Sequence, residues 1–386
     1  MNAHRTSAYL IIVTVFGLIV LGLVMMTSTS AYAPESKGDP MFLFNRQIKG
    51  LGVGGLLCAL AAWFDYRLLG KTWKLWYGIA IVLLVLCFIP PIGQEHFGAK
   101  RWINIGHRFQ PSEFAKLAGV VALAWCLARD EVPSRRFVRG FLAPFACGGG
   151  LMVLIAPEVD LGTTALIGTT TLIVMFVAGT RLGYIGAMVV AGVGSLGAAI
   201  ALVPERAGRF LAFLDPVKYP DDAYQGIQAL IALGSGGEDG RGLGLGRQKM
   251  FYLPAAHTDF IFPIVGEELG LAFTLGVVIA FMVFVLAGFH IAAHARERFG
   301  MLLGCGVTLL IGLQAAVNIG VTTTVLPNKG MPMPFVSFGG TNLVVCLIGV
   351  GILLSIYRRG QGETEAKPGL VVLPVSVKKG RKIVRM

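Results

Sequence analysis

The feature that most constrains this chain is a series of apolar runs of about twenty residues, separated by short polar segments. A run of that length can span the hydrocarbon core of a bilayer as one helix. Only 14% of the 386 residues are charged, whereas 55% are hydrophobic. A water-soluble protein of this size needs more charge to cover its surface. The predicted fold class is therefore all-α, a polytopic membrane protein.

About ten transmembrane helices are predicted, and the first is expected to be retained rather than cleaved as a signal peptide. Basic residues concentrate in every second connection and after the last span, which places both termini on the cytoplasmic side. The external connections are then 93–111, 205–258 and 325–339, and the longest joins helices 7 and 8. The expected helices cover residues 8–30, 47–64, 75–92, 112–129, 141–157, 161–180, 184–204, 260–289, 299–324 and 340–357.

Neither the net charge nor the cysteines of the chain indicate nucleic-acid binding, a disulfide framework or a metal site. The net charge of +12 does not indicate nucleic-acid binding, because the basic residues follow the pattern of cytoplasmic loops. The six cysteines lie in or beside apolar runs without a C-x-x-C pair, so we interpret them as packing residues. Residues 359–386 form a basic tail, expected to be disordered and cytoplasmic, which either touches anionic lipid or has no role.

The segment "GAKRWINIGHRFQPSEFAKL" combines cations with a helix start. Its Gln-Pro-Ser-Glu step places Glu113 in a first turn, where the helix dipole favours an acid. Lys116 follows three residues later on the same face, so the two are expected to pair at the membrane boundary. The pair either holds the helix end, or Lys116 gathers anionic phosphates together with Lys100 and Arg101. Arg101 and Trp102 fit a membrane-interface anchor equally well.

Asp160, in "APEVDLGTTALIG", lies in a very short external turn before a predicted span. Such an acid either caps the helix that follows or faces a cavity as a site residue. The long external loop then contains an amphipathic stretch around Tyr224, Ile227 and Ile231, expected at the outer membrane interface. The glycine-rich run 234–246 that comes next follows no strand, and is interpreted as a mobile loop or as a backbone cradle for phosphate.

The segment "RQKMFYLPAAHTDF" brings polar residues to the mouth of the eighth span. Its candidate site residues are Arg247, Lys249, His257 and Asp259. His257 and Asp259 could bind a metal, although two ligands at this spacing are a weak signal. Asp259 is partly buried in this expectation, and such a position can tune a carboxylate to act as a base.

Two adjacent acids, Glu267 and Glu268, lie inside the eighth predicted span, where a carboxylate costs about 2.5–3.5 kcal/mol. Adjacent residues point about 100° apart on a helix, so they are assigned to helix packing or to shaping a cavity. The last external connection, "VLPNKGMPMPFVSFGGTNL", has three prolines and a Gly-Gly step that predict a rigid turn. It supplies Lys329 and Ser337 as candidate cavity residues, with a purely structural turn as the alternative.

Seven segments together resemble one known family. They are "GAKRWINIG", "FQPSEFAKL", "VDLGTT", "YQGIQALIALGSGG", "LGRQKMFYLPAAHTDFIF", "GEELG" and "PNKGMPMPFVSFGG". In order and in topological position they resemble the motifs of the SEDS family (shape, elongation, division and sporulation), over about residues 8–358. The Ala before His257, together with Gly266 and Lys329, resembles the division branch more than the elongation branch.

The resemblance implies a ten-span enzyme of the cytoplasmic (inner) membrane, with residues 1–358 as one glycosyltransferase domain. Members polymerise lipid II into peptidoglycan glycan strands at the outer face, by inverting transfer with loss of undecaprenyl pyrophosphate. They work with a class B penicillin-binding protein and with other division proteins. The resemblance assigns the catalytic role to Asp259, and it makes cavity positions of Trp102, Glu113, Lys116 and Asp160.

The chain departs from the family's motifs at two places. Val159 precedes Asp160 where the family usually has proline, and Ala255 stands where it often has glutamate. Neither change removes the acid at Asp259, but the first weakens the assignment of Asp160.

Three functions are compatible with polar residues at the outer ends of apolar helices. In an enzyme, a carboxylate accepts a proton from the attacking hydroxyl. Cations or a divalent metal, Mg²⁺ or Mn²⁺, would stabilise the leaving pyrophosphate, and Asp259 is a possible ligand. A lipid II flippase is the second function, but it needs a polar route through the inner half of the membrane, and few charges mark one. A non-catalytic division scaffold is the third, and it needs no acid at Asp259.

Overall fold

The computed structural model describes residues 3–36, 38–90, 92–96, 99–104, 108–129, 137–158 and 160–361. Helices dominate it. The α-helices are α1 (Ala3–Ser30), α2 (Phe42–Trp63), α3 (Arg67–Lys71), α4 (Trp73–Leu86), α5 (Pro111–Ala128), α6 (Ala143–Ile155), α7 (Leu161–Val177), α8 (Leu182–Ala201), α9 (Pro204–Leu214), α10 (Pro220–Gly236), α11 (Ile261–Ala293), α12 (Arg298–Thr322) and α13 (Gly340–Gln361). The strands are β1 (Gly93–His96), β2 (Ala99–Asn104) and β3 (Arg108–Phe109).

Each predicted span overlaps one of these helices, namely α1, α2, α4, α5, α6, α7, α8, α11, α12 or α13. Among the described residues, 6 helices are long and apolar enough to cross a membrane. The chain is therefore a multi-pass membrane protein, and the count of ten spans stays a prediction. The predicted tail begins within α13, which continues to Gln361, and the rest of it lies outside the described residues.

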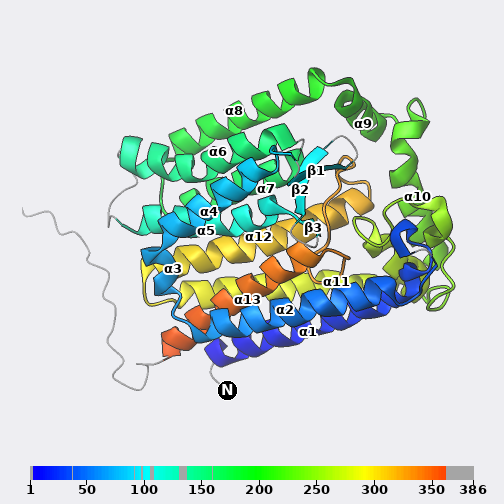
Figure 1. The fold of residues 1–386 in the computed structure, drawn as a ribbon, viewed down its shortest axis with the longest axis horizontal. Coiled ribbons are helices and arrows are strands. Elements are labelled where there is room, and N and C mark those ends of the chain that lie inside the picture. Colours follow the sequence, from blue (N-terminus) through cyan, green and yellow to red (C-terminus); the bar gives the residue numbers. More distant parts are fainter. Residues whose placement is uncertain are drawn as a thin grey trace, which may run out of the picture.

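The long helices run side by side, and the strands gather with α9 and α10 toward one end of the bundle (Figure 1). The strands, α9 and α10 lie at that end, which agrees with the prediction that loops 93–111 and 205–258 share one side. The start of α1 and the end of α13 lie together at the opposite end. Which end faces the cytoplasm stays a prediction. For brevity, the end that carries the strands is called the loop end below.

Two helices, α5 and α12, lie within the bundle and bury most of their length. A polar side chain on either helix therefore needs a partner inside the protein, since an unpaired buried polar group costs about 1–3 kcal/mol. Glu113 and Lys116 on α5, and Gln314 and Asn318 on α12, are such side chains, and all are buried. These four residues connect the interior of the bundle to the candidate site.

A small sheet in loop 93–111 was not predicted. Its strands are antiparallel in the order β1-β2-β3, with Ile103 on β2 opposite both Gly93 and Phe109. Ile103 is fully buried. The sheet is held by pairing between very short polar strands. This pairing is a tertiary effect, and the alternation of residues in the loop does not predict it.

Candidate active site

Asp259 lies in the turn that leads into α11, at the loop end of the bundle. Its side chain is partly buried. Neighbouring elements hold the backbone of this turn in place: Asn318 Nδ2 on α12 donates to the Asp259 carbonyl at 2.8 Å. The Phe338 amide of the last connection donates to the His257 carbonyl at 2.9 Å. The turn is therefore fixed by hydrogen bonds from α12 and from connection 325–339.

Gly330 of the same connection packs directly against the Asp259 carboxylate. A Cβ atom at residue 330 would lie 2.6 Å from Asp259 Oδ2, so no larger residue fits without moving the carboxylate. The adjacent Lys329 lies over the start of α7, where its Cγ and Cε would both be 3.3 Å from a Cβ at Gly162. Connection 325–339 thus brings a cation and a close backbone contact to the site.

Burial raises the pKa of the Asp259 carboxyl to about 6. The positive charge of Arg101 lowers this pKa, and the negative charge of Asp160 raises it. These charges act on Asp259 only because β2 and the start of α7 meet the turn before α11. A carboxylate with this pKa is ionised at neutral pH yet basic enough to accept a proton.

Asp160 is the N-cap of α7, which was one of its two predicted roles. Its Oδ1 accepts from the Thr163 amide at 3.1 Å, and its Oδ2 accepts from Thr163 Oγ1 at 2.8 Å. Gln110 Nε2 reaches Oδ2 at 3.5 Å. The cap does not exclude the second role, because the charge of Asp160 also acts on Asp259.

Arg101 and Trp102 lie on β2 of the small sheet. Arg101 Nε donates to the Glu158 carbonyl at 3.2 Å, which holds the guanidinium beside the turn that contains Asp160. Trp102 pairs with Gln94 of β1 and is half-buried. The side chain of Lys100 lies outside the described residues. The sheet therefore serves to carry Arg101 to the site.

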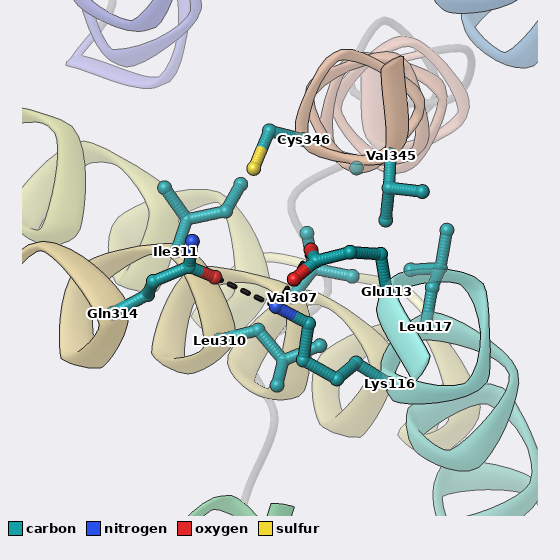
Figure 2. A pocket seen from close by; sticks show the side chains of 10 residues that line it. Glu113, Lys116, Leu117, Val307, Leu310, Ile311, Gln314, Val345 and Cys346 are labelled. Atoms are coloured by element: carbon teal, nitrogen blue, oxygen red, sulfur yellow. Dashed lines mark hydrogen bonds and ion pairs between the residues drawn. The ribbon is translucent and has the colours of Figure 1, made fainter. Parts of the chain in front are cut away.

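The predicted pair of Glu113 and Lys116 is present. Lys116 Nζ lies 2.7 Å from Glu113 Oε2, and each side chain is only 4% exposed. Figure 2 shows the pair beside a small cavity of about 20 Å³, lined mostly by apolar side chains of α5, α12 and α13. A cavity of this size holds about one water molecule, so it is no substrate pocket. A contact between Lys116 and substrate stays a prediction.

A chain of hydrogen bonds links this ion pair to the candidate site. Lys116 Nζ donates to Gln314 Oε1 at 2.8 Å (Figure 2). Gln314 Nε2 then donates to the Pro332 carbonyl at 2.8 Å and to Asn342 Oδ1 at 2.9 Å. Pro332 is two residues from Gly330, which touches Asp259. The buried pair thus supports the connection that encloses the carboxylate.

Glu268 holds the glycine-rich loop against α11 and α1. Its Oε1 lies 2.6 Å from Lys249 Nζ, and both side chains are almost completely buried. Ser28 Oγ on α1 donates to Glu268 at 2.7 Å, and the Gly244 amide donates to Glu268 Oε2 at 2.9 Å. Lys249 Nζ also donates to the Gly244 carbonyl at 2.8 Å. The Lys249 ammonium therefore has partners within the protein, and its predicted contact with substrate is untested.

Glu267 holds the next stretch of the loop, at Arg247 and Gln248, against α11. It accepts from the Arg247 amide at 2.8 Å and from the Gln248 amide at 3.1 Å. The prediction of helix packing or cavity shaping named neither partner, because the route of the loop cannot be derived from the spacing of two acids. The adjacent glutamates are tolerated because loop amides and a buried lysine neutralise and solvate them.

Two further predicted residues, Arg247 and His257, precede Asp259 in the chain. Arg247 is exposed, His257 is half-buried, and the His257 ring lies 6.0 Å from the Phe338 ring, centroid to centroid. Sequence reasoning missed Gln314 and Asn318, although a signal existed. They are the amide side chains of an apolar run, and they stand four residues apart, on one face of a helix.

Ser337 supports the turn rather than lining open space. Its Oγ donates to the Thr258 carbonyl at 2.5 Å and accepts from the Met333 amide at 2.8 Å. We expect Ser337→Ala to lower the free energy of unfolding by about 1–3 kcal/mol, because two buried backbone groups lose a partner. Thermal unfolding of the purified protein measures this. Ser195→Ala, at an exposed serine of α8, is the matched control, and equal unfolding temperatures for both variants would contradict the prediction.

The chain belongs to the FtsW, RodA and SpoVE family of membrane proteins, described as "Cell cycle protein", whose profile matches residues 8–361. It is 40% identical over 375 residues to the probable peptidoglycan glycosyltransferase FtsW of Geobacter sulfurreducens, covering 94% of this chain and 98% of that protein. It is 35% identical over 366 residues to stage V sporulation protein E of Bacillus subtilis, covering 93% and 99%. These matches confirm the resemblance to the SEDS family.

Solved structures agree with this assignment. The rod shape determining protein RodA of Thermus thermophilus superposes with a TM-score of 0.67 at 26% identity, covering 91% of this chain and 96% of that one. A chain of a peptidoglycan synthase complex, described as coordinating polymerization and crosslinking, superposes with a TM-score of 0.73 at 26% identity, covering 91% and 98%. Several relatives carry the name FtsW, which agrees with the predicted division branch.

Proposed function

We propose that this chain is a peptidoglycan glycosyltransferase that polymerises lipid II into glycan strands at the outer face of the cytoplasmic membrane. The observation that carries the proposal is Asp259, a partly buried carboxyl with a pKa of about 6 on which the charge of Arg101 acts and which Gly330, the neighbour of Lys329, contacts. Relatives that share over a third of this sequence are named as such glycosyltransferases. A lipid-linked substrate suits a site at the end of a membrane helix.

The reaction follows from these groups. The sugar 4-hydroxyl of one chain attacks C1 of another lipid-linked sugar and transfers its proton to the Asp259 carboxylate. The new bond joins O4 to C1, while the bond from C1 to the pyrophosphate oxygen breaks with inversion. Undecaprenyl pyrophosphate leaves with that electron pair. Arg101, whose charge acts on Asp259, and Lys329, which lies over the start of α7, are the cations that could stabilise its developing charge.

A divalent cation, Mg²⁺ or Mn²⁺, is part of this proposal only as an ion that Asp259 would hold together with the substrate. Among the described residues, no group of three or more acidic, histidine or cysteine ligands surrounds Asp259. Asp160, the nearest acid acting on it, already accepts two hydrogen bonds from Thr163. Asp259 alone would therefore hold such an ion together with phosphate oxygens of the substrate, as Mg²⁺ is often held. When bound, the ion would supply charge stabilisation to the pyrophosphate.

A class B penicillin-binding protein is the proposed partner, with division as the cellular process. The likeness to a chain of a peptidoglycan synthase complex and to proteins named FtsW supports this. The experiment that tests the function combines purified chain and partner with fluorescent lipid II, in detergent and in vesicles. Polymer in detergent supports the enzyme. Movement of lipid II across vesicles without polymer would support a flippase. If the protein shows neither polymerisation nor lipid movement, the result would support a non-catalytic scaffold.

The pH dependence of polymerisation is expected to report Asp259. Because the base must be ionised, kcat/KM should rise with pH through about 6, the pKa of this carboxyl. Asp160→Asn removes a charge that raises this pKa, so the rise should move to lower pH, and asparagine still caps α7. Arg101→Gln removes a charge that lowers it, so the rise should move to higher pH. Initial rates across pH 4.5–7.5, a window of about three units around this pKa, measure both shifts. Shifts in the opposite directions would contradict the assignment.

A further inference from the structure

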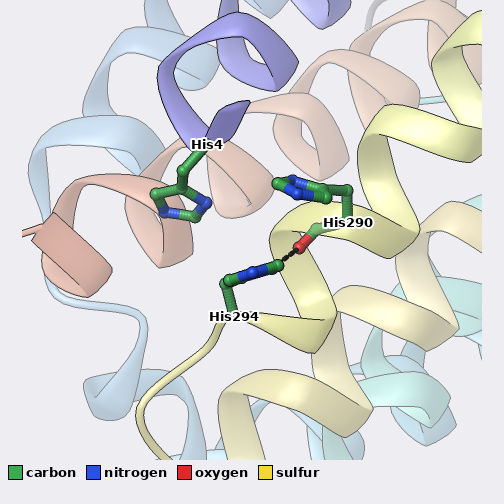
Figure 3. A group of neighbouring side chains, drawn as sticks. All are labelled: His4, His290 and His294. Carbon is green, nitrogen blue, oxygen red and sulfur yellow. Dashed lines mark hydrogen bonds between the residues drawn. The ribbon is translucent and has the colours of Figure 1, made fainter. Parts of the chain in front are cut away.

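Three histidines meet at the end of the bundle opposite the candidate active site. His4 comes from the start of α1, His290 from the last turn of α11, and His294 is the C-cap residue of α11. Figure 3 shows the three side chains close together, with His4 on one helix and the other two on its neighbour. Each ring offers one nitrogen, and these nitrogens lie within 4.8 Å of one another.

Hydrogen bonds prepare two of these rings for a ligand. His294 Nδ1 lies 2.8 Å from the His290 carbonyl oxygen, which only accepts, so Nδ1 carries the proton and Nε2 keeps its lone pair. His290 Nδ1 lies 2.9 Å from Ser7 Oγ on α1, which can accept in the same way. Histidines that bind metals usually donate their other ring N–H to such an acceptor. Both residues thus show the arrangement of a metal ligand.

His4 supplies the second, independent observation. Both of its ring nitrogens are inaccessible to solvent, and among the residues that the structure describes neither makes a hydrogen bond of ordinary geometry, the backbone of Tyr357 being only a weak partner. A buried polar group without a partner is costly, by about 1–3 kcal/mol. A cation bound between the three rings would satisfy it.

We propose that His4, His290 and His294 bind one transition-metal ion, of which Zn²⁺ is the representative. Imidazole nitrogens suit Zn²⁺, Ni²⁺ and Cu²⁺, whereas Mg²⁺ and Ca²⁺ require oxygen ligands, and no carboxylate belongs to the described cluster. A tetrahedral site with bonds of about 2.1 Å needs nitrogens about 3.4 Å apart, which small rotations of the rings provide. Water completes the coordination, since His294 is exposed.

The ion would join α1 to the far end of α11. The first residues of α11 follow Asp259, and α1 also contributes Ser28 to the network around Glu268. One bound metal at this end would therefore fix the pairing of two helices that both contribute to the loop end. The effect expected is on stability and on metal content, not on the chemistry at Asp259.

The test uses the full chain, purified without a polyhistidine tag, stripped with a chelator and titrated with Zn²⁺ against a chromophoric competitor. The wild type should bind one ion per chain, and the ion should raise its unfolding temperature. His294→Gln, at the most exposed ligand, should weaken binding by at least about 100-fold. Ser7→Ala should weaken it by about 10-fold or more, since it removes the hydroxyl behind His290 and leaves the three ligands in place.

His96→Gln, a histidine of β1 at the loop end, is the matched control and should bind Zn²⁺ like the wild type. Substituting Co²⁺ gives a second readout, because visible absorption bands report nitrogen ligands directly. A wild type that binds no Zn²⁺ would overturn the proposal. So would a His294→Gln variant that retains wild-type stoichiometry and affinity.

Discussion

Alanine at either Glu113 or Lys116 is expected to lower the free energy of unfolding by about 3–5 kcal/mol. The two side chains form one ion pair of 2.7 Å, at 4% exposure each, so either change leaves a buried charge without its partner. Loss of Lys116 also removes the donor to Gln314, and with it the support of the connection around Gly330. Thermal unfolding and the yield of monodisperse protein in one detergent measure the effect.

The double variant Glu113→Gln, Lys116→Met is the control for this prediction. Replacing both members of a buried pair by groups of similar volume is often neutral or stabilising. The double variant should therefore be more stable than either alanine variant. If both alanine variants unfold at the wild-type temperature, the pair contributes no more than a surface pair.

Asp259→Asn is expected to reduce the rate of glycan formation by about 10²–10⁴-fold. Asparagine keeps the size of the side chain, and the hydrogen bond from Asn318 goes to the backbone carbonyl of residue 259, so the turn before α11 should persist. What is lost is the basic carboxylate with a pKa of about 6. A larger loss would be expected if Asp259 also holds a divalent cation.

Asp239→Asn serves as the matched control for that variant. Asp239 is an exposed acid of the loop that precedes Asp259, so its change should leave the rate unaffected. Both variants should reach the membrane in wild-type amounts and should copurify with the penicillin-binding partner. Near-native polymerisation by Asp259→Asn would reject the assignment of the base.

The helices were predictable from the sequence, because a run of apolar residues long enough for a bilayer has few alternatives to a helix. The pairing of Glu113 with Lys116 was predictable for a similar reason, since residues three apart share a helix face. Both inferences use local spacing only. Asp259 was predicted as the catalytic residue from its family motif and from its position at the end of a span, and this role stays a prediction.

Other parts depend on how distant segments meet, and local patterns do not contain that information. The short sheet that carries Arg101 forms through pairing across turns. Glu267 and Glu268 bind backbone amides, such as that of Gly244, and the side chain of Lys249. These partners belong to a loop about twenty residues earlier in the chain, which folds back onto α11. The support from Gln314 to connection 325–339 likewise appears only once α12 and that connection are placed together.

The central claim is that this chain joins lipid-linked sugars with loss of undecaprenyl pyrophosphate, using Asp259 as the base. The most direct measurement follows the purified chain and its partner on lipid II, counting glycosidic bonds and released undecaprenyl pyrophosphate together. The account predicts one released molecule for each bond with the wild type, and formation of both products slowed by about 10²–10⁴-fold with Asp259→Asn. A wild type that moves lipid II across vesicles but releases no undecaprenyl pyrophosphate would contradict it.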